Sequence, residues 1–172
     1  KRADLRGMRS EGCTLTGADL SGAYLIRAEL LESKLVRASL READLRGARF
    51  LSCDLGEGDL SGARLGETEF GETNLVGAAL GGCALLGGIF RQCRMEGMDL
   101  SGADLSGADL SGAGLRGARM AGCNLTGADL SMADLRQADL GRAILRDAVA
   151  READFSGALL REAEIDYLQM AG

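Results

Sequence analysis

The sequence predicts an all-β solenoid, because a five-residue repeat runs through the chain without a shift in register. Of the 34 positions that are multiples of five, 32 hold Leu, Phe, Met or Ile, and the exceptions are Ser10 and Ala150. Two residues earlier, 31 of 34 positions hold Ala, Cys, Thr, Gly or Ser. A period of five would scatter apolar residues around an α-helix, whereas each small–polar–apolar triplet alternates as a short strand does.

The two residues that follow each central apolar residue are predicted to form a corner. Gly occupies the second corner position in 18 of its 26 occurrences, as expected for a type II turn, in which this residue has a positive φ. Where this position is charged, we expect a turn without positive φ. The sequence has four such corners in succession, at Arg27, Glu32, Arg37 and Glu42.

Segments such as Ala103-Asp104-Leu105-Ser106-Gly107 resemble the A-(D/N)-L-x-x motif of the pentapeptide-repeat family, and the resemblance covers essentially the whole chain. It implies a right-handed quadrilateral parallel β-helix with four faces and 20 residues per coil. Dividing the 172 residues by this coil length gives about 8.6 coils. We expect residues 1–160 to form the β-helix, and residues 161–172 to form its last partial coil or the start of a C-terminal cap. The resemblance also implies a homodimer through the C-terminal end as one oligomeric state.

Aromatic and sulfur-containing residues fall on inward positions. Phe50, Phe70 and Phe90 are 20 residues apart and should stack, which favours core packing over an aromatic cofactor slot. All five cysteines lie at the small inward position. Those that share a column are two coils apart, about 9–10 Å, which is too far for a disulfide. We therefore expect buried, inert thiols and a reducing, cytoplasmic location. The cysteines are Cys13, Cys53, Cys83, Cys93 and Cys123.

The sequence offers no candidate active site. It has no His, which general acid–base catalysis at neutral pH commonly uses, and its Asp residues alternate outward into water. No nucleophile has a base and an orienting group in a recognisable pattern. We therefore expect no enzyme activity, no cofactor, no bound metal and no direct contact with nucleic acid. No apolar run is long enough to cross a membrane.

Charge is uneven along the chain, whose net charge is −6. Residues 1–50 carry a net charge of +3, residues 51–115 carry −7, and residues 116–172 carry −2. The acidic middle segment includes Asp99, Asp104 and Asp109, which we take as candidate interaction residues. Over the roughly 16 Å that this segment would occupy, B-DNA carries roughly 9 charges, so local mimicry of DNA is a hypothesis to test.

Two outward apolar groups are further candidates for contact with a partner, because contiguous exposed apolar side chains often mark an interface. One lies in a stretch without charged residues between Glu72 and Arg91, and the other lies near the start of the chain. The first consists of Val76, Leu86 and Ile89. The second consists of Tyr24, Ile26, Leu31 and Leu51.

These observations favour a non-enzymatic scaffold that presents the surface of a β-helix to an unidentified protein partner. Because the chain opens on Lys1, we expect it to be one part of a longer, bacterial-type protein. The family resemblance implies an alternative function: a DNA-mimicking binder of DNA gyrase or a related topoisomerase, which protects the enzyme from fluoroquinolone-type inhibitors.

Overall fold

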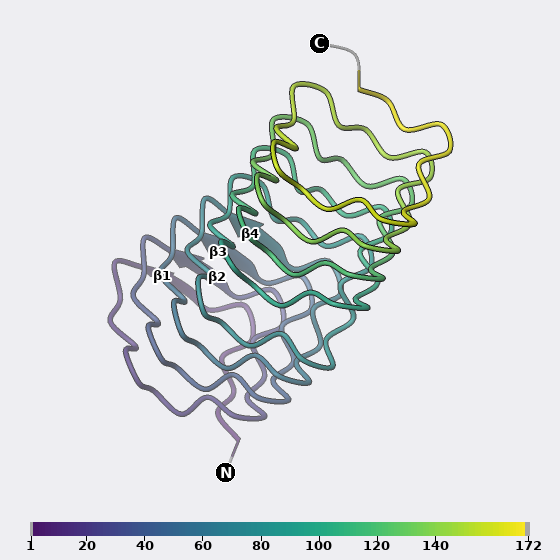
Figure 1. Ribbon diagram of the computed structural model, residues 1–172. Helices are drawn as coiled ribbons and strands as arrows, with labels where there is room; N and C mark the ends of the chain where they lie inside the picture. Colours follow the sequence, from purple (N-terminus) through teal and green to yellow (C-terminus); the bar gives the residue numbers. More distant parts are fainter. Residues whose placement is uncertain (1, 171–172) are drawn as a thin grey trace. The chain divides into compact units, whose positions relative to one another are not determined.

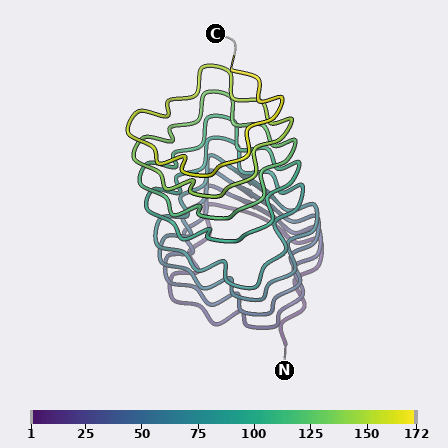
Figure 2. The ribbon, with the colours of Figure 1, turned by 45° about the vertical axis from the view of Figure 1, so that its right-hand side comes forward.

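The computed structural model describes residues 2–170 and divides into two compact units, residues 1–84 and 85–172. Within each unit the chain winds through stacked, four-sided coils, as Figures 1 and 2 show. No helix occurs among the described residues, and every pairing between coils is parallel. The all-β prediction is therefore confirmed.

Unit 1 contains the four segments that are long enough to count as strands, and they form one parallel sheet in chain order (Figure 1). The strands are β1 (Arg9–Glu11), β2 (Glu29–Leu31), β3 (Arg49–Leu51) and β4 (Glu69–Gly71). Leu30 pairs with Phe50, and Phe50 pairs with Phe70, so each step along the sheet is one coil of 20 residues. The other faces are joined by single parallel bridges with the same 20-residue offset. The predicted coil length is therefore confirmed.

Each backbone N–H of a regular repeat has its own acceptor, as residues 109–113 of unit 2 show. Asp109 N–H bonds back to the previous coil, Leu110 and Gly112 N–H bond forward to the next coil, and Ala113 N–H closes the turn on the Leu110 carbonyl at 3.0 Å. The remaining N–H, that of Ser111, is bound by the Asp109 side chain at 3.1 Å. Asp before the central Leu thus accepts the one N–H that neither ladder nor turn can satisfy. We call this side-chain contact the Asp clamp.

The corners differ from the sequence-based expectation at the charged positions. The second corner residue has a positive φ at every corner from residue 7 to residue 167, whether or not it is Gly. Arg27, Glu32, Arg37 and Glu42 have φ values of 55°, 49°, 58° and 55°, so the prediction of a different turn there was wrong. The bonds to the coils above and below require the same corner geometry throughout. They outweigh a local cost of about 1 kcal/mol for a left-handed L-residue.

Burial confirms the predicted inward positions from residue 20 to residue 150, whereas Leu160, Ile165 and Met170 in the last coil are exposed. Central residues from Leu20 to Ala150 and most of their small companions are buried, including Leu105 at 0% exposure. The clear exception among outward positions is Asp44, which is only 5% exposed. Its environment is described with the functional site.

Substitution of a corner glycine should isolate the cost of the positive φ. Gly122 has a φ of +66°, and a Cβ added there would meet nothing within 4 Å. Gly122→Ala should therefore destabilise the protein by about 1 kcal/mol through the backbone alone. Gly81→Ala is the matched control, because Gly81 lacks a positive φ and its nearest neighbour would be Ser61 Oγ at 4.0 Å. Equal urea midpoints for the two variants would contradict this account of the corner.

Two substitutions at Asp129 should measure the Asp clamp. Its Oδ1 accepts the Ser131 N–H at 2.9 Å. Asp129→Asn retains an Oδ1 acceptor and should change the free energy of unfolding by less than about 0.5 kcal/mol, whereas Asp129→Ala should lose about 1 kcal/mol. Urea denaturation at pH 7 measures both. If Asn destabilises as much as Ala, charge rather than the hydrogen bond explains the Asp.

Candidate functional site

The interior of each unit is filled by its own side chains. In unit 1 the rings of Phe50 and Phe70 stack with centroids 5.3 Å apart and planes 13° apart, and both side chains are fully buried. Phe90 is 1% exposed in unit 2. The interpretation of the three Phe residues as core is therefore confirmed. A ligand or partner would have to bind to an outer face.

The cysteines lie at the small inward position and are all free thiols. Cys53, Cys93 and Cys123 are buried as predicted, whereas Cys13 and Cys83 are partly exposed. Burial raises the pKa of Cys123 to about 12, and it also raises the pKa of Cys53 and of Cys83. These thiols are therefore protonated at neutral pH and are weak nucleophiles. Residues 2–170 contain no group of three or more His, Cys, Asp or Glu side chains that is placed to hold a metal ion.

Hydroxyl and thiol groups at the small position form hydrogen bonds that the sequence reasoning missed. Thr73 Oγ1 donates to the Phe50 carbonyl at 2.8 Å, and its oxygen accepts the Cys53 N–H at 3.3 Å. Thr68 Oγ1 donates to the Leu45 carbonyl, also at 2.8 Å. These side chains stabilise the coils rather than forming a reactive site. In the sequence, the available sign of these hydrogen bonds was Thr in place of Ala at an inward position.

The three candidate aspartates lie on three different faces of unit 2. Asp99 and Asp109 form bridges with Arg119 and Asp129 of the next coil, and Asp104 lies on the face between them, one corner from each. A corner separates each Asp from the next, because the residues are five apart in sequence. Neighbours in sequence therefore point away from the coil in different directions. The three carboxylates do not form a stripe along one face.

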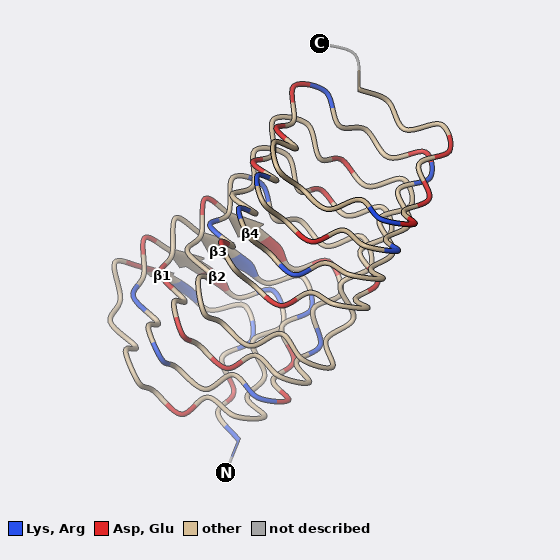
Figure 3. Ribbon diagram, viewed as in Figure 1, with Lys and Arg blue, Asp and Glu red and all other residues tan. Residues whose placement is uncertain are grey.

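Arginines of neighbouring coils neutralise much of the acidic segment. Arg119 Nη2 lies 3.1 Å from Asp99 Oδ2, and Arg91 forms an ion pair with Asp109. Arg37 and Arg41 of unit 1 likewise form ion pairs with acidic residues of the following coil. Figure 3 shows the positive and negative positions interspersed along the coils. The summed charge of the sequence segment therefore overstates the negative charge of any one face.

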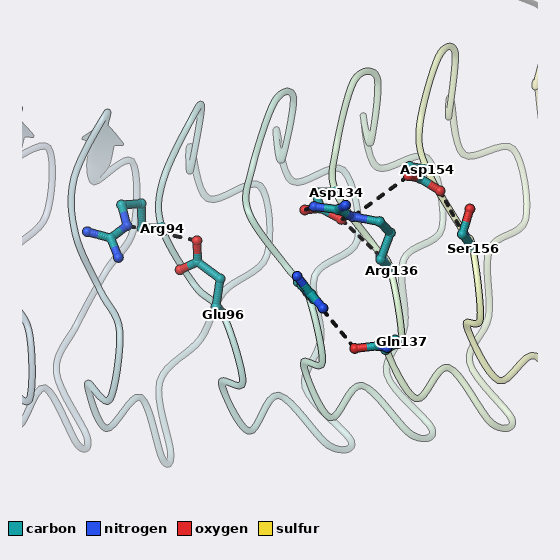
Figure 4. Close-up of polar contacts among 8 residues, drawn as sticks. Arg94, Glu96, Asp134, Arg136, Gln137, Asp154 and Ser156 are labelled. Carbon is teal, nitrogen blue, oxygen red and sulfur yellow. Dashed lines mark hydrogen bonds and ion pairs between the residues drawn. The ribbon is translucent and has the colours of Figure 1, made fainter.

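The same pattern occurs on another face of unit 2, where polar residues from four coils are aligned (Figure 4). Arg136 binds Asp134 through two hydrogen bonds, at 2.7 and 2.6 Å, and its Nε lies 3.7 Å from Asp154 Oδ2. These contacts lower the pKa of Asp134, mainly through the hydrogen bond from Arg136. Arg94 and Glu96 form a looser pair at 3.8 Å. Positive and negative side chains are therefore mixed on this face, and neither charge is in excess.

The apolar group near the start of the chain is divided between two faces of unit 1. Leu31 and Leu51 are direct partners in β2 and β3, and both are half-buried. Tyr24 and Ile26 lie at and beside the preceding face, where Tyr24 is 38% exposed. The structure therefore joins these four residues in pairs rather than in one patch.

The other apolar group spans both units. Val76 belongs to unit 1 and is half-buried, whereas Leu86 and Ile89 belong to unit 2. Leu86 is 63% exposed, which is the highest value in this group. The final coil of unit 2 adds exposed apolar side chains that were not among the candidates. They are Leu159, Leu160, Ile165, Tyr167 and Met170.

A hollow on unit 1 was also missed. It has a volume of about 370 Å³ and is lined by Ile26, Arg27, Arg46, Gly47, Gly66 and Glu67. Beside it lies the buried Asp44, which Arg46 binds through two bonds of 2.7 Å and which Arg64 approaches at 3.4 Å. Both arginines lower the pKa of Asp44, Arg46 more strongly. The sequence placed Asp44 in water because alternation alone cannot show that side chains from the next coil cover it.

The final ten described residues continue the coil. Glu164 bridges to Ile144 and Gln169 bridges to Val149, and Tyr167 has the corner φ of 57°.

Residues 2–170 include no helical segment with the length and hydropathy of a membrane span.

Comparison with known proteins identifies the repeat. The family model for pentapeptide repeats matches in eight copies, over residues 1–30, 23–62, 80–117, 89–127, 103–142 and 128–166. Among curated protein sequences, none matches this chain significantly.

The chain is also similar to solved structures, among which QnrB1 shows the shared fold. A trypsin-treated variant of QnrB1, a plasmid-mediated fluoroquinolone resistance protein, is 20% identical, with a TM-score of 0.70 over 95% of this chain and 85% of that one. HetL, a pentapeptide repeat protein involved in heterocyst differentiation regulation in the cyanobacterium Nostoc sp., is 33% identical over 98% of this chain and 90% of its own, with a TM-score of 0.44. The chain belongs to the pentapeptide-repeat family and has its right-handed quadrilateral β-helical fold.

Proposed function

We propose that this protein is a non-enzymatic scaffold that presents the outer faces of its coils to a protein partner. The proposal rests on the different roles of inward and outward residues within the repeat. Inward residues fill the core, and regular backbone bonds fix the coils, so only outward side chains are free to vary in chemistry. Such a surface can hold contact residues in a rigid arrangement, which reduces the entropy lost on binding.

A DNA-mimicking topoisomerase binder is supported less well. Mimicry of duplex DNA requires negative charges aligned along one face, at about one per 1.7 Å. Asp99, Asp104 and Asp109 diverge onto three faces, and arginines pair with two of them. The likeness to QnrB1, at 20% identity, supports the shared fold and not a shared target.

Photo-cross-linking should test the scaffold proposal and its alternative together. A photoreactive amino acid at Leu86, which is 63% exposed, should give discrete protein adducts in cells that express the chain. Met132, 61% exposed and isolated in sequence from the candidate groups, is the matched control position and should give few adducts. Mass spectrometry identifies the adducts.

The scaffold proposal fails if none of positions 24, 86 and 104 gives a protein adduct above the level at position 132. Purified DNA gyrase provides the second arm. We expect no change in its supercoiling rate at micromolar concentrations of the protein, with or without a fluoroquinolone. Inhibition, or protection from the drug, would favour the DNA-mimicking alternative.

We further propose that two copies associate through the C-terminal end. Leu159, Ile165 and Tyr167 are 49%, 55% and 82% exposed, so the last coil offers apolar surface that a second copy could cover. Leu159→Ser combined with Tyr167→Gly should shift the protein to monomer in multi-angle light scattering. Gly suits the corner φ of 57° at position 167, so folding should be retained. An unchanged mass for the double variant would refute this interface.

A further inference from the structure

Two repeats of unit 1 lack the Asp clamp on the same side of the coil. Tyr24 and Arg64 occupy the position that holds Asp44 in the coil between them. Neither side chain carries an acceptor suited to the clamp, and the N–H groups of Ile26 and Gly66 have no hydrogen-bond acceptor among the described residues of unit 1. In clamped repeats this N–H is bound by an outward side chain, so it points outward. Unclamped N–H groups occur in other repeats too, but Ile26 and Gly66 both line one hollow. The two residues are two coils apart, about 9–10 Å, so a single carboxylate accepts from one of these N–H groups at a time.

Two glycines make the hollow by leaving its floor without side chains. A Cβ at Gly47 would lie 3.4 Å from Arg27 Cγ, and a Cβ at Gly66 would lie 3.7 Å from Arg46 Cγ. Each arginine stem therefore lies across a glycine of the next coil. The hollow of about 370 Å³ is thus bordered by two guanidinium groups and lies over bare backbone. Such a combination of N–H groups and arginines suits an anion.

The charges around the hollow leave one positive charge in excess. Arg46 and Arg64 share the carboxylate of Asp44, whose side chain is 7% exposed. Arg27 forms no ion pair with any described residue. Glu67 is the one acidic residue in the lining of the hollow, because Asp44 lies beside it. Together with Asp44 and Arg64 beside the hollow, its lining brings three arginines near two carboxylates, and a ligand with a single negative charge would complete the balance.

We propose that this hollow binds one carboxylate of a protein partner, the side chain of an Asp or Glu in an exposed acidic–apolar segment. The proposal rests on the scaffold function and names the chemistry that one face recognises. Glu67 disfavours a doubly charged phosphate or a polyanion by repulsion. Ile26 gives the hollow an apolar border, and the partly exposed Tyr24 lies two residues before it in the chain. These side chains suit an apolar residue beside the acid, and Tyr and Arg are common at interface hot spots.

Amide NMR spectroscopy with defined peptides tests the site directly. The probes are acetyl-Leu-Glu-Leu-amide, its Gln counterpart and inorganic phosphate, each titrated into the ¹⁵N-labelled chain. The Glu peptide should shift the amide resonances of Ile26 and Gly66 saturably. The Gln peptide and phosphate should each bind at least fivefold more weakly. Equal affinity for the Glu and Gln peptides, or for the Glu peptide and phosphate, would overturn the proposal.

Substitution of Arg64 provides the matched variants. Arg64→Asn supplies an internal acceptor for the Gly66 N–H and removes a positive charge, so the Glu peptide should bind at least tenfold more weakly. Because Asn occurs naturally at this repeat position in Asn74, where it clamps the Val76 N–H at 3.1 Å, folding should be retained. Arg94→Asn makes the same change in unit 2 and should leave binding unchanged. Parent-like binding by the Arg64→Asn variant would refute the site.

The outcomes separate this proposal from the scaffold function. Protein adducts at position 24 that persist in the Arg64→Asn variant would refute the carboxylate site while supporting the scaffold. Selective binding of the Glu peptide in the absence of any protein adduct in cells would support the site and count against the scaffold.

Discussion

The corner with positive φ at every fifth residue is the constraint on which both units depend. It fixes the length of each face, and four such faces return the chain to the same column after 20 residues, where the backbone bonds to the previous coil. Beside the turning backbone there is little room for a side chain, so Ala and Cys usually follow the corner, although the larger Met98 is buried there too. The many non-glycine corners show that the bonds between coils outweigh the local preference of individual residues.

That constraint explains how much of the fold could be predicted from the sequence. The period of five determines which residues point inward, and burial of residues such as Leu105 and Ala108 agrees with it. The same period cannot show what lies beside an outward residue, because its neighbours are 18 to 20 positions away. Asp44 is buried for this reason: Arg64 of the following coil approaches it. The charged corners were predicted wrongly because the prediction used the conformational preference of single residues. In the structure, the backbone hydrogen bonds between coils outweigh that preference.

The charged residues also show that neighbours in the sequence are not neighbours on the surface. A run of acidic residues spaced by five turns around the coil, so Asp99, Asp104 and Asp109 share no face. Residues 20 apart do share a face, and there the chain often alternates sign, as Arg49 and Glu69 do at 2.8 Å. Exposed pairs of this kind add little stability singly. They do make each face a pattern of small charge clusters, so recognition depends on individual sites rather than on net charge.

Departures from the repeat therefore carry more functional information than the repeat itself. Asp before the central Leu satisfies an otherwise unpaired N–H, so a chain with Tyr24 or Arg64 at that position loses a stabilising bond. One such loss only exposes an N–H to water. Two losses on one face, with glycine in place of the side chains that would fill the gap, create a concave surface with open donors. Backbone bonds join the coils across this surface, from Arg27 N–H to the Arg46 carbonyl and from Gly47 N–H to the Gly66 carbonyl. A surface that is ordered before binding loses less entropy when a partner binds.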